Sequence, residues 1–149
     1  MDIISVMTPP FRVRRAGWSR DDTQLRQIRA AVFVVEQGVP LDLEWDGIDA
    51  ECAHVLAYND DNLAIGTGRL LPDGHIGRMA VLEPWRHRGV GSALLRELMA
   101  IAKERDMQEV VLNAQIQASA FYERHGFVAE GESFLDAGIP HLRMRRPLR

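Results

Sequence analysis

Three basic side chains and two glycines lie close together in the segment WRHRGVGSALL, residues 85–95. Because Gly89 and Gly91 lack side chains, the backbone there can approach a ligand and adopt a positive φ, so that successive N–H groups point into one concavity. The helix expected to follow adds unpaired N–H groups and a partial positive charge, worth about 0.3–2 kcal/mol for an anion. The segment therefore predicts a site for a negatively charged group. The alternative is a glycine turn that only leads into a helix.

Two well-known phosphate motifs do not match this segment. A dinucleotide-binding fingerprint needs a glycine three positions after Gly91, where the chain has Leu94. A P-loop needs Gly-Lys-Ser/Thr, and the single lysine of the chain is Lys103. What remains is the RxxGxG spacing of Arg86, Gly89 and Gly91, placed between a strand ending in RMAVL and an amphipathic helix.

Other reactive side chains give weaker signals. No HxxxH, CxxC or paired-carboxylate spacing is present, and His75 and His87 have no partner at a ligand spacing, so we expect no metal. No serine occupies a G-x-S-x-G elbow, which disfavours a serine nucleophile. The lone Cys52 is interpreted as a packing residue, with a nucleophile as the alternative.

The composition limits the class of protein. A chain of 149 residues that is 46% hydrophobic and 26% charged suits one globular domain. The net charge of -3 disfavours nucleic acid as a partner. The amino terminus does not resemble a secretory signal, and no apolar run approaches the roughly 20 residues that a membrane helix needs. With one cysteine, no internal disulfide can form, so we expect a cytoplasmic protein that binds no membrane.

The first half of the chain predicts strands around one helix. Residues 1–10 are expected to form a flexible tail, and residues 11–149 one domain. A strand at 11–16 precedes a helix that Ser19 or Asp21 can cap and that ends near Gly38 and Pro40. A polar, acidic loop at 39–51 follows. The helix is expected to place one apolar face on the sheet, formed by Leu25, Ile28, Val32 and Val35.

The second half predicts the site's framework. Strands at 53–58, 63–71 and 75–82 should form an antiparallel meander. A helix ending near Arg105 then leads to a buried strand at 109–115, which a right-handed crossover makes parallel to the strand before the helix. A short helix closed by Gly126 and a last hairpin complete a mixed α/β fold around one mostly antiparallel sheet. The face that the long helix should turn to this sheet consists of Leu94, Leu95, Leu98, Ile101 and Ala102.

The RxxGxG spacing and its surroundings resemble the GNAT superfamily of acyl-CoA-dependent N-acyltransferases. Residues 80–127 follow that family's order of strand, pyrophosphate loop, helix, strand and short helix ending in Tyr and Gly-Phe. The segments VFVVEQGVP and FYERHGFVAEGESFLDAGIPHLRM look most like small bacterial ElaA-like members, and the resemblance covers roughly residues 11–146. It implies a single GNAT-like domain with helices on both faces of the sheet and one parallel strand pair splayed around the cofactor.

The resemblance also implies where acetyl-CoA binds. Its pantetheine arm would run along the strand edge at Met79, Ala80 and Val81. Asn113 or Gln115 would line the other side, unless these amides merely cap a turn. The pyrophosphate would be held by backbone N–H groups of the loop, formed by Arg86, His87, Arg88, Gly89, Val90, Gly91 and Ser92.

The implied reaction is transfer of an acetyl group to a primary amine. Amines with a pKa near 10 are mostly charged at pH 7, so a base or a desolvating pocket must assist. By resemblance, the Val81 N–H would polarise the thioester carbonyl, and Tyr122 would act as general acid beside the sulfur, where it also contacts the cofactor. Without the resemblance, Phe121 and Tyr122 would be interpreted as core aromatics.

The acidic loop supplies candidates for the base. A solvated acidic loop is one interpretation; the alternative is that its carboxylates attract a cationic amine and one group takes the proton through water. Glu44 is the first candidate and His54 the second. His141 can reach the same cleft, or has no catalytic role. The side chains in question are Glu44, Asp46, Asp49, Glu51 and His54.

The glycine-rich loop is also compatible with two other functions. A catalytically silent acyl-CoA-binding module would bind the cofactor without turnover, and a nucleotide-binding module would bind ATP with similar affinity. For the enzyme, the expected acceptor is a small-molecule or peptide amine, and the resemblance is compatible with a homodimer.

Overall fold

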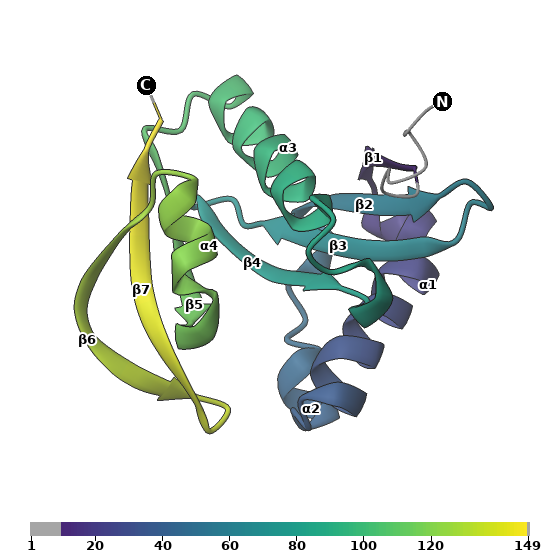
Figure 1. Cartoon of the computed structure of the whole chain (residues 1–149). Coiled ribbons are helices and arrows are strands. Elements are labelled where there is room, and N and C mark those ends of the chain that lie inside the picture. The colour runs from purple at the N-terminus through teal and green to yellow at the C-terminus, as the bar shows by residue number, and fades with distance from the viewer. Residues whose placement is uncertain (1–9, 149) are drawn as a thin grey trace, which may run out of the picture.

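A seven-stranded sheet in the order β1-β2-β3-β4-β5-β7-β6 forms the centre of the computed structural model, which describes residues 10–148 (Figure 1). All neighbouring strands are antiparallel except β4 and β5, which are parallel. The predicted fold class is therefore confirmed. The predicted tail at 1–10 lies, except for Pro10, outside the described residues. The strands are β1 (Phe11–Ala16), β2 (Ala53–Asn59), β3 (Ala64–Leu70), β4 (His75–Val81), β5 (Glu109–Gln115), β6 (Val128–Asp136) and β7 (Ile139–Pro147).

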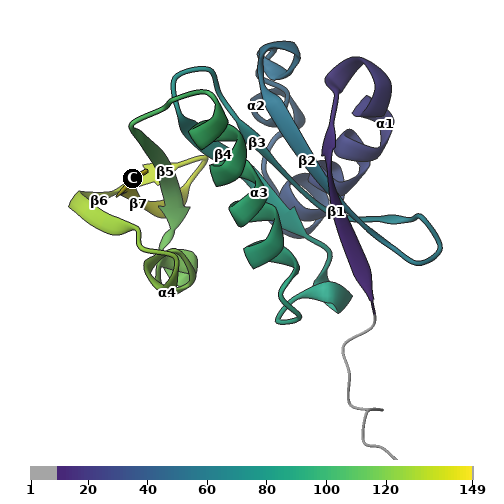
Figure 2. The ribbon, with the colours of Figure 1, turned by 90° about the horizontal axis from the view of Figure 1, so that it is seen from above.

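Helices cover both faces of this sheet (Figure 2). One face carries α3 and α4, and the other carries α1 with its continuation η2, a π-helix, and the short α2. Within residues 10–148 no helix is long and apolar enough to cross a membrane. The helical elements are α1 (Trp18–Arg29), η2 (Ala30–Glu36), α2 (Leu41–Glu44), η3 (Asp49–Glu51), η4 (Glu83–Trp85), α3 (Val90–Glu104), η5 (Ile116–Ala118) and α4 (Ser119–Arg124).

The main core lies between the sheet and α3. The predicted apolar face of this helix is buried, with Leu94, Leu95 and Leu98 fully inaccessible to solvent. A glycine in β3 permits this close packing, because a Cβ at Gly66 would lie only 3.0 Å from a Leu94 methyl. A smaller apolar cluster fills the other face, where Ile28 and Val32 pack on the sheet.

The first helix differs from the prediction at both ends. It begins at Trp18, and Asp21 accepts a hydrogen bond from the Gly17 N–H at 2.9 Å instead of starting the helix itself. Beyond Arg29 the hydrogen bonds lengthen to the i→i+5 pattern, as in Gln37 N to Val32 O at 3.0 Å. A π turn holds more residues than an α turn, so the apolar stripe rotates away. Val35, predicted to face the sheet, is consequently 80% exposed.

The parallel strands β4 and β5 separate soon after they meet. They pair through His75 with Val111 and Ile76 with Leu112, and then each strand continues without the other. The β3–β4 pairing is irregular between Thr67 and Arg69, opposite Arg78, whose φ is +49°. This irregularity is a β-bulge, which bends β4 away from β5. The predicted splayed pair is thus present.

Candidate functional site

A cleft of about 490 Å³ opens where β4 and β5 separate. Its walls come from β4, β5, η2 and the β6–β7 hairpin, and Tyr122 of α4 reaches it from the opposite face of the sheet. The polar and ionisable side chains that line it are Gln37, Glu44, Arg69, His75, Arg78, Arg86, Asn113, Gln115, Tyr122, Asp136 and His141.

The glycine-rich loop ends at the first turn of α3. Gly89 has a φ of +85°, a conformation that only glycine adopts readily, and it is the N-cap of the helix without a side-chain cap. The first helical hydrogen bond runs from Ala93 N to Gly89 O at 3.1 Å. Consequently the N–H groups of Val90, Gly91 and Ser92 have no acceptor among residues 10–148. Three unpaired donors at a helix N-terminus suit a phosphate group.

The basic side chains of this loop bond the protein itself. Arg86 forms an ion pair with Glu36 at 2.6 Å and donates through Nε to the Val81 carbonyl at 2.9 Å. Arg88 donates through Nε to the Pro84 carbonyl at 3.0 Å. His87 is exposed. The two arginines of the loop are thus engaged with the protein, while its N–H groups at the start of α3 have no acceptor among residues 10–148.

Ser92 and Gly91 connect the loop to α4. The Ser92 hydroxyl lies 2.9 Å from Nε2 of His125 at the end of α4. A Cβ at Gly91 would lie 3.4 Å from the ring of Phe121. The loop thus rests on the helix that carries Tyr122.

One edge of β4 faces the gap beside β5. Leu82 N donates to Ile65 O at 2.9 Å, and Val81 is paired with Gly66 of β3. Because successive N–H groups of an extended strand point to opposite edges, the N–H and C=O of Val81 point away from β3 and toward the gap. Met79 and Ala80 also line the cleft, so all three predicted strand residues lie beside it.

Tyr122 lines the cleft from the α3 side of the sheet. Its ring packs edge-on against Phe121 and Phe127, with centroids 5.0 Å and 5.8 Å away. Burial raises the pKa of the phenol to about 12, which keeps the hydroxyl protonated at neutral pH. This is the protonation state that a general acid needs.

The amides predicted at the far side of the cofactor also line the cleft. Gln115 donates to Gln37 at 2.8 Å, so the end of β5 is joined to the residue that follows η2. It also accepts a hydrogen bond from Gln117 at 2.7 Å. Asn113 is exposed within the cleft. The Gln115 amide therefore bridges two walls of the cleft rather than capping a turn.

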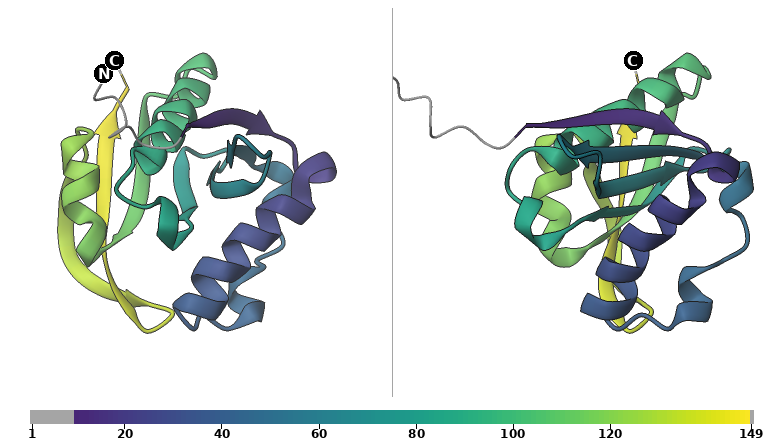
Figure 3. Two further views of the ribbon diagram at one scale, coloured as in Figure 1. Left: turned by 45° about the vertical axis from the view of Figure 1, so that its right-hand side comes forward. Right: turned by 90° about the vertical axis from the view of Figure 1, so that its right-hand side faces the viewer.

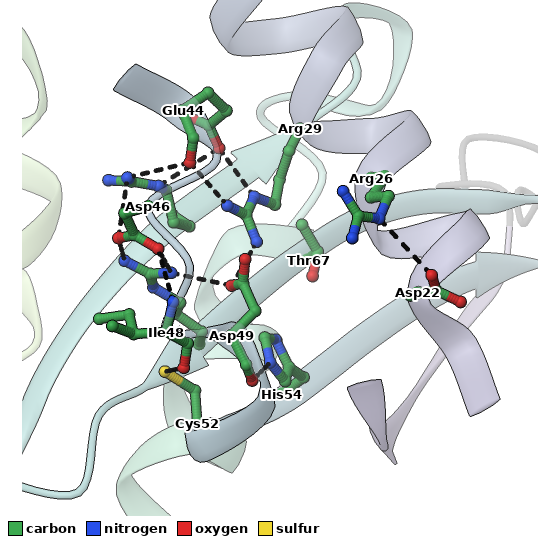
Figure 4. A network of polar contacts seen from close by, with 12 residues as sticks. Asp22, Arg26, Arg29, Glu44, Asp46, Ile48, Asp49, Cys52, His54 and Thr67 are labelled. Carbon is green, nitrogen blue, oxygen red and sulfur yellow. Dashed lines mark hydrogen bonds and ion pairs between the residues drawn. The ribbon is translucent and has the colours of Figure 1, made fainter. Parts of the chain in front are cut away.

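The acidic segment is folded into a closed ring of charges (Figure 4). Arg29 bonds Glu44 at 2.7 Å and Asp49 at 2.6 Å. Arg69 bonds Asp49 at 2.8 Å and also Asp46. Arg78 closes the ring, with Nη2 3.2 Å from Asp46 and Nε 3.3 Å from Glu44. We call this set the arginine–carboxylate ring; its members are Arg29, Glu44, Arg78, Asp46, Arg69 and Asp49.

This ring contradicts the interpretation of residues 39–51 as a solvated acidic loop. Glu44 and Asp49 are 3% and 4% exposed, and three guanidinium groups balance the three carboxylates. The carboxylates are already paired, so they offer no excess charge to a cationic amine. A buried arginine in an apolar strand signals a carboxylate partner, and Arg69 in AIGTGRL carries that signal in the sequence.

Glu44, the first candidate for the base, does lie at the cleft. Burial raises the pKa of its carboxyl, even though Arg29 and Arg78 oppose the change. A proton on Glu44 would have to displace its interactions with these two guanidinium groups. A role for Glu44 as the base remains a prediction.

His54, the second candidate, is not among the residues that line the cleft. Its ring stacks on Trp18 at 5.3 Å, and Nε2 lies 2.9 Å from the Asp49 carbonyl. Burial lowers the pKa of this imidazole. Its position does not support the predicted role in proton transfer to or from a substrate.

Two histidines do line the cleft: His141, which the sequence analysis expected could reach it, and His75, for which no role was predicted. His75 is bound to Asp73 at 3.0 Å, and His141 to the carbonyl of Ile139 at 2.6 Å. In the part of the chain that the structure describes, no three His, Cys, Asp or Glu side chains gather as metal ligands would. Cys52 is half-buried, and burial raises the pKa of its thiol, which disfavours a nucleophile.

Comparisons with known proteins agree with this geometry. A family model described as "Acetyltransferase (GNAT) domain" matches residues 23–148. The Bacillus subtilis protein YjcF, described as an uncharacterized N-acetyltransferase, is 38% identical over 139 residues, which cover 89% of this chain and 99% of YjcF.

Two solved structures share both sequence and fold with this chain. An acyl-CoA N-acyltransferase from Pseudomonas aeruginosa is 32% identical, with a TM-score of 0.80 over 92% of this chain and 99% of that chain. ElaA from Escherichia coli is 30% identical, with a TM-score of 0.81 over 91% of this chain and 99% of that chain.

Proposed function

The chain belongs to the GNAT acetyltransferase family, and from this premise we propose that it transfers the acetyl group of acetyl-CoA directly to a primary amine. One observation carries the proposal. The unpaired N–H groups at the start of α3 follow β4 in the chain after η4 and the basic turn, and the free edge of β4 borders the cleft. An anionic group and an extended amide chain can therefore be held side by side.

The cleft, together with the loop that begins at Arg86 on its wall, suits the parts of acetyl-CoA. The N–H groups of Val90, Gly91 and Ser92 would hold the pyrophosphate, with Gly89 giving the loop its left-handed turn. The free edge of β4 at Met79–Val81 would pair with the amides of the pantetheine arm, as a strand added to the sheet would. Asn113 and Gln115 would line its other side.

Acetyl-CoA would supply an acetyl group activated as a thioester. The Val81 N–H, which points into the gap, would donate to the carbonyl oxygen as negative charge develops on it. Tyr122 would give its proton to the departing sulfur, since its phenol is protonated at neutral pH. Among residues 10–148, no serine, threonine or cysteine lines the cleft, which supports direct transfer to the amine over a covalent acyl-enzyme.

The proposal is tested in two steps. Isothermal calorimetry should show saturable binding of acetyl-CoA, and ATP should not compete at similar concentrations. Incubation with acetyl-CoA and a panel of amines should then give products heavier by one acetyl group, detected by mass spectrometry. The panel should include polyamines, amino sugars, free amino acids and peptide amino termini.

The outcomes separate the competing functions. A protein with no saturable acetyl-CoA binding would falsify the proposal. Binding without acetylation of any amine would point instead to a catalytically silent acyl-CoA-binding module. Equal affinity for ATP would point to a nucleotide-binding module.

A further inference from the structure

His141 of β7 is held in a single tautomer at the cleft. Its Nδ1 lies 2.6 Å from the carbonyl oxygen of Ile139. A carbonyl oxygen can only accept a hydrogen bond, so Nδ1 carries the proton. In the neutral ring, Nε2 then has a free lone pair, and among residues 10–148 nothing bonds it. His141 is 8% exposed and lines the cleft. Among the described residues, the buried side-chain atoms that lack a hydrogen-bond partner do not include its Nε2, so this unpaired nitrogen is accessible to solvent.

Strand pairing places this ring on the side of the sheet opposite Tyr122. His141 stands directly across from Gln115 in the β5–β7 ladder, and such partners project to the same face. Gln115 bonds Gln37 beyond η2, so this is the η2 face. Tyr122 instead packs with the α3 core. Figure 3 shows the β6–β7 hairpin and the end of the α1–η2 helix at the same end of the molecule.

We propose that His141 is the general base of the acetyl transfer, taking a proton through Nε2 from the acceptor ammonium as it enters from the η2 face. The inference rests on the proposed function, and His141 takes the role for which the sequence suggested Glu44 first and His54 second; Glu44 is already paired with Arg29 and Arg78. The amine would approach on one face of the gap between β4 and β5, and the sulfur would depart beside Tyr122 on the other.

The groups around His141 leave its ring available to a substrate. Phe134 of β6 stacks on it, with centroids 6.0 Å apart, and fixes its plane. On its own strand, Arg143 lies two residues further on and is paired with Glu130. Gln115 of β5 is neutral. The other ionisable groups of the cleft are Asp136 of β6, His75 and Arg78 of β4, Arg69 of β3, Arg86 of the loop, Glu44 of α2 and Tyr122 of α4.

Most of these groups already have a partner. Arg69, Arg78 and Glu44 belong to the arginine–carboxylate ring, Arg86 pairs with Glu36, and His75 bonds Asp73. Asp136 is exposed near the hairpin tip. Nε2 of His141 is therefore an acceptor at the cleft that no protein donor occupies.

The step balances in protons and bonds. The acceptor ammonium gives one proton to His141 Nε2, which later releases it to water. The neutral nitrogen then forms the N–C bond to the acetyl group while the C–S bond breaks. The sulfur takes the proton of Tyr122, and the phenolate regains the proton that the new amide nitrogen loses.

The test compares His141→Asn with the wild type, using the amine of the panel that the wild type acetylates fastest. Asparagine keeps a side-chain N–H near the position of Nδ1 but has no basic nitrogen. We expect kcat to fall by about 10²-fold or more while KM for acetyl-CoA stays unchanged. The wild-type rate should reach its plateau at a lower pH than the variant rate. The variant rate should instead keep rising toward the pKa of the amine, near 10.

Two further variants make the result specific. His75→Asn removes the other histidine of the cleft and should keep the wild-type pH profile. In His141→Ala, imidazole added to the buffer should restore part of the lost rate. Free imidazole would not restore the rate if the substitution had only disturbed the structure.

The proposal is overturned if His141→Asn keeps the wild-type kcat and pH profile, or if imidazole fails to raise the rate of His141→Ala. Calorimetry with acetyl-CoA on each variant separates this failure from that of the proposed function. A wild type that binds no acetyl-CoA or acetylates no amine overturns both, whereas an active wild type with an equally active variant overturns the role of His141 alone.

Discussion

The guanidinium of Arg29 donates to Glu44 Oε2 at 2.7 Å, and the two side chains are 1% and 3% exposed. The same guanidinium bonds Asp49, so one buried cation from α1 holds two carboxylates of the segment between η2 and β2. This contact fixes the wall of the cleft that contains Glu44. Its removal would leave charges buried without a partner.

We therefore expect Arg29→Met to lower the free energy of unfolding by about 3–5 kcal/mol, because Glu44 and Asp49 would lose a buried partner. Urea denaturation at pH 7 measures the change. Adding Glu44→Gln and Asp49→Asn to the variant should recover part of the loss. The control Arg143→Ala breaks an exposed ion pair with Glu130 and should cost at most about 1 kcal/mol. Equal losses in the two arginine variants would contradict a special role for the ring.

Asp46 should make stability depend on acid pH. Burial is the largest single effect and raises the pKa of its carboxyl, but the hydrogen bond and charge of Arg69, the Ile48 N–H and the charge of Arg78 together outweigh it, and the pKa falls from 3.8 to about 2. A carboxyl with a depressed folded pKa stabilises the protein above its unfolded pKa, and this contribution is lost as the pH falls toward 2. Glu44 works in the opposite direction, because its pKa is raised.

The pH prediction is tested on Asp46→Asn. The wild type should lose at most about 2 kcal/mol more free energy of unfolding than the variant between about pH 5 and pH 2. Urea denaturation at several pH values measures both curves. Parallel curves would show that the Asp46 carboxyl does not carry this dependence.

Backbone donors rather than basic side chains should hold the cofactor pyrophosphate. Gly89→Val forces a β-branched residue into a φ of +85° and should weaken acetyl-CoA binding by about tenfold or more, which is about 1.4 kcal/mol. Arg88→Ala should have a smaller effect, since its guanidinium bonds the Pro84 carbonyl. Calorimetry compares the two. Gly131→Val, at a φ of +75° in open space on β6, is the matched control for backbone strain. Equal effects of Gly89→Val and Arg88→Ala would show that the basic side chains contribute as much to pyrophosphate binding as the backbone does.

The Tyr122 hydroxyl should matter for turnover and little for binding. Tyr122→Phe keeps the edge-on ring contacts and removes the proton donor, so we expect kcat to fall by about 10²-fold with KM for acetyl-CoA nearly unchanged. Steady-state kinetics over a range of pH measures both. Tyr58→Phe changes the other tyrosine of the chain, on β2, and should leave the rate as it is. An unchanged rate in Tyr122→Phe would remove Tyr122 as the acid.

Features encoded by neighbouring residues were predictable from the sequence. The buried face of α3, the left-handed glycine before it, the antiparallel meander of β2, β3 and β4, and the β6–β7 hairpin follow from local periodicity and turn chemistry, and all agree with the structure. The family resemblance is confirmed by the match over residues 23–148, and its ElaA-like character by the shared fold of ElaA.

What the sequence missed depends on contacts between distant segments. Val35 was assigned to the buried face because an α-helical period was assumed where the helix becomes a π-helix. The arginine–carboxylate ring joins Arg29, Arg69 and Arg78 to carboxylates 15 to 34 positions away, and no local pattern encodes such pairing. His54 and His141 look alike in the sequence. Only their positions in the folded sheet distinguish them: His54 stacks on Trp18, and His141 lies at the cleft.

The brief pairing of β4 with β5 has a mechanical consequence. The sheet consists of two blocks, β1–β4 and β5–β7–β6, joined by a ladder only two residue pairs long. A ligand that pairs with the free edge of β4 would fill the gap between these two blocks and connect them beyond the short ladder. Binding of the ligand would then restrict the motion of one block relative to the other. Amide hydrogen exchange would slow at both Val81 of β4 and Asn113 of β5.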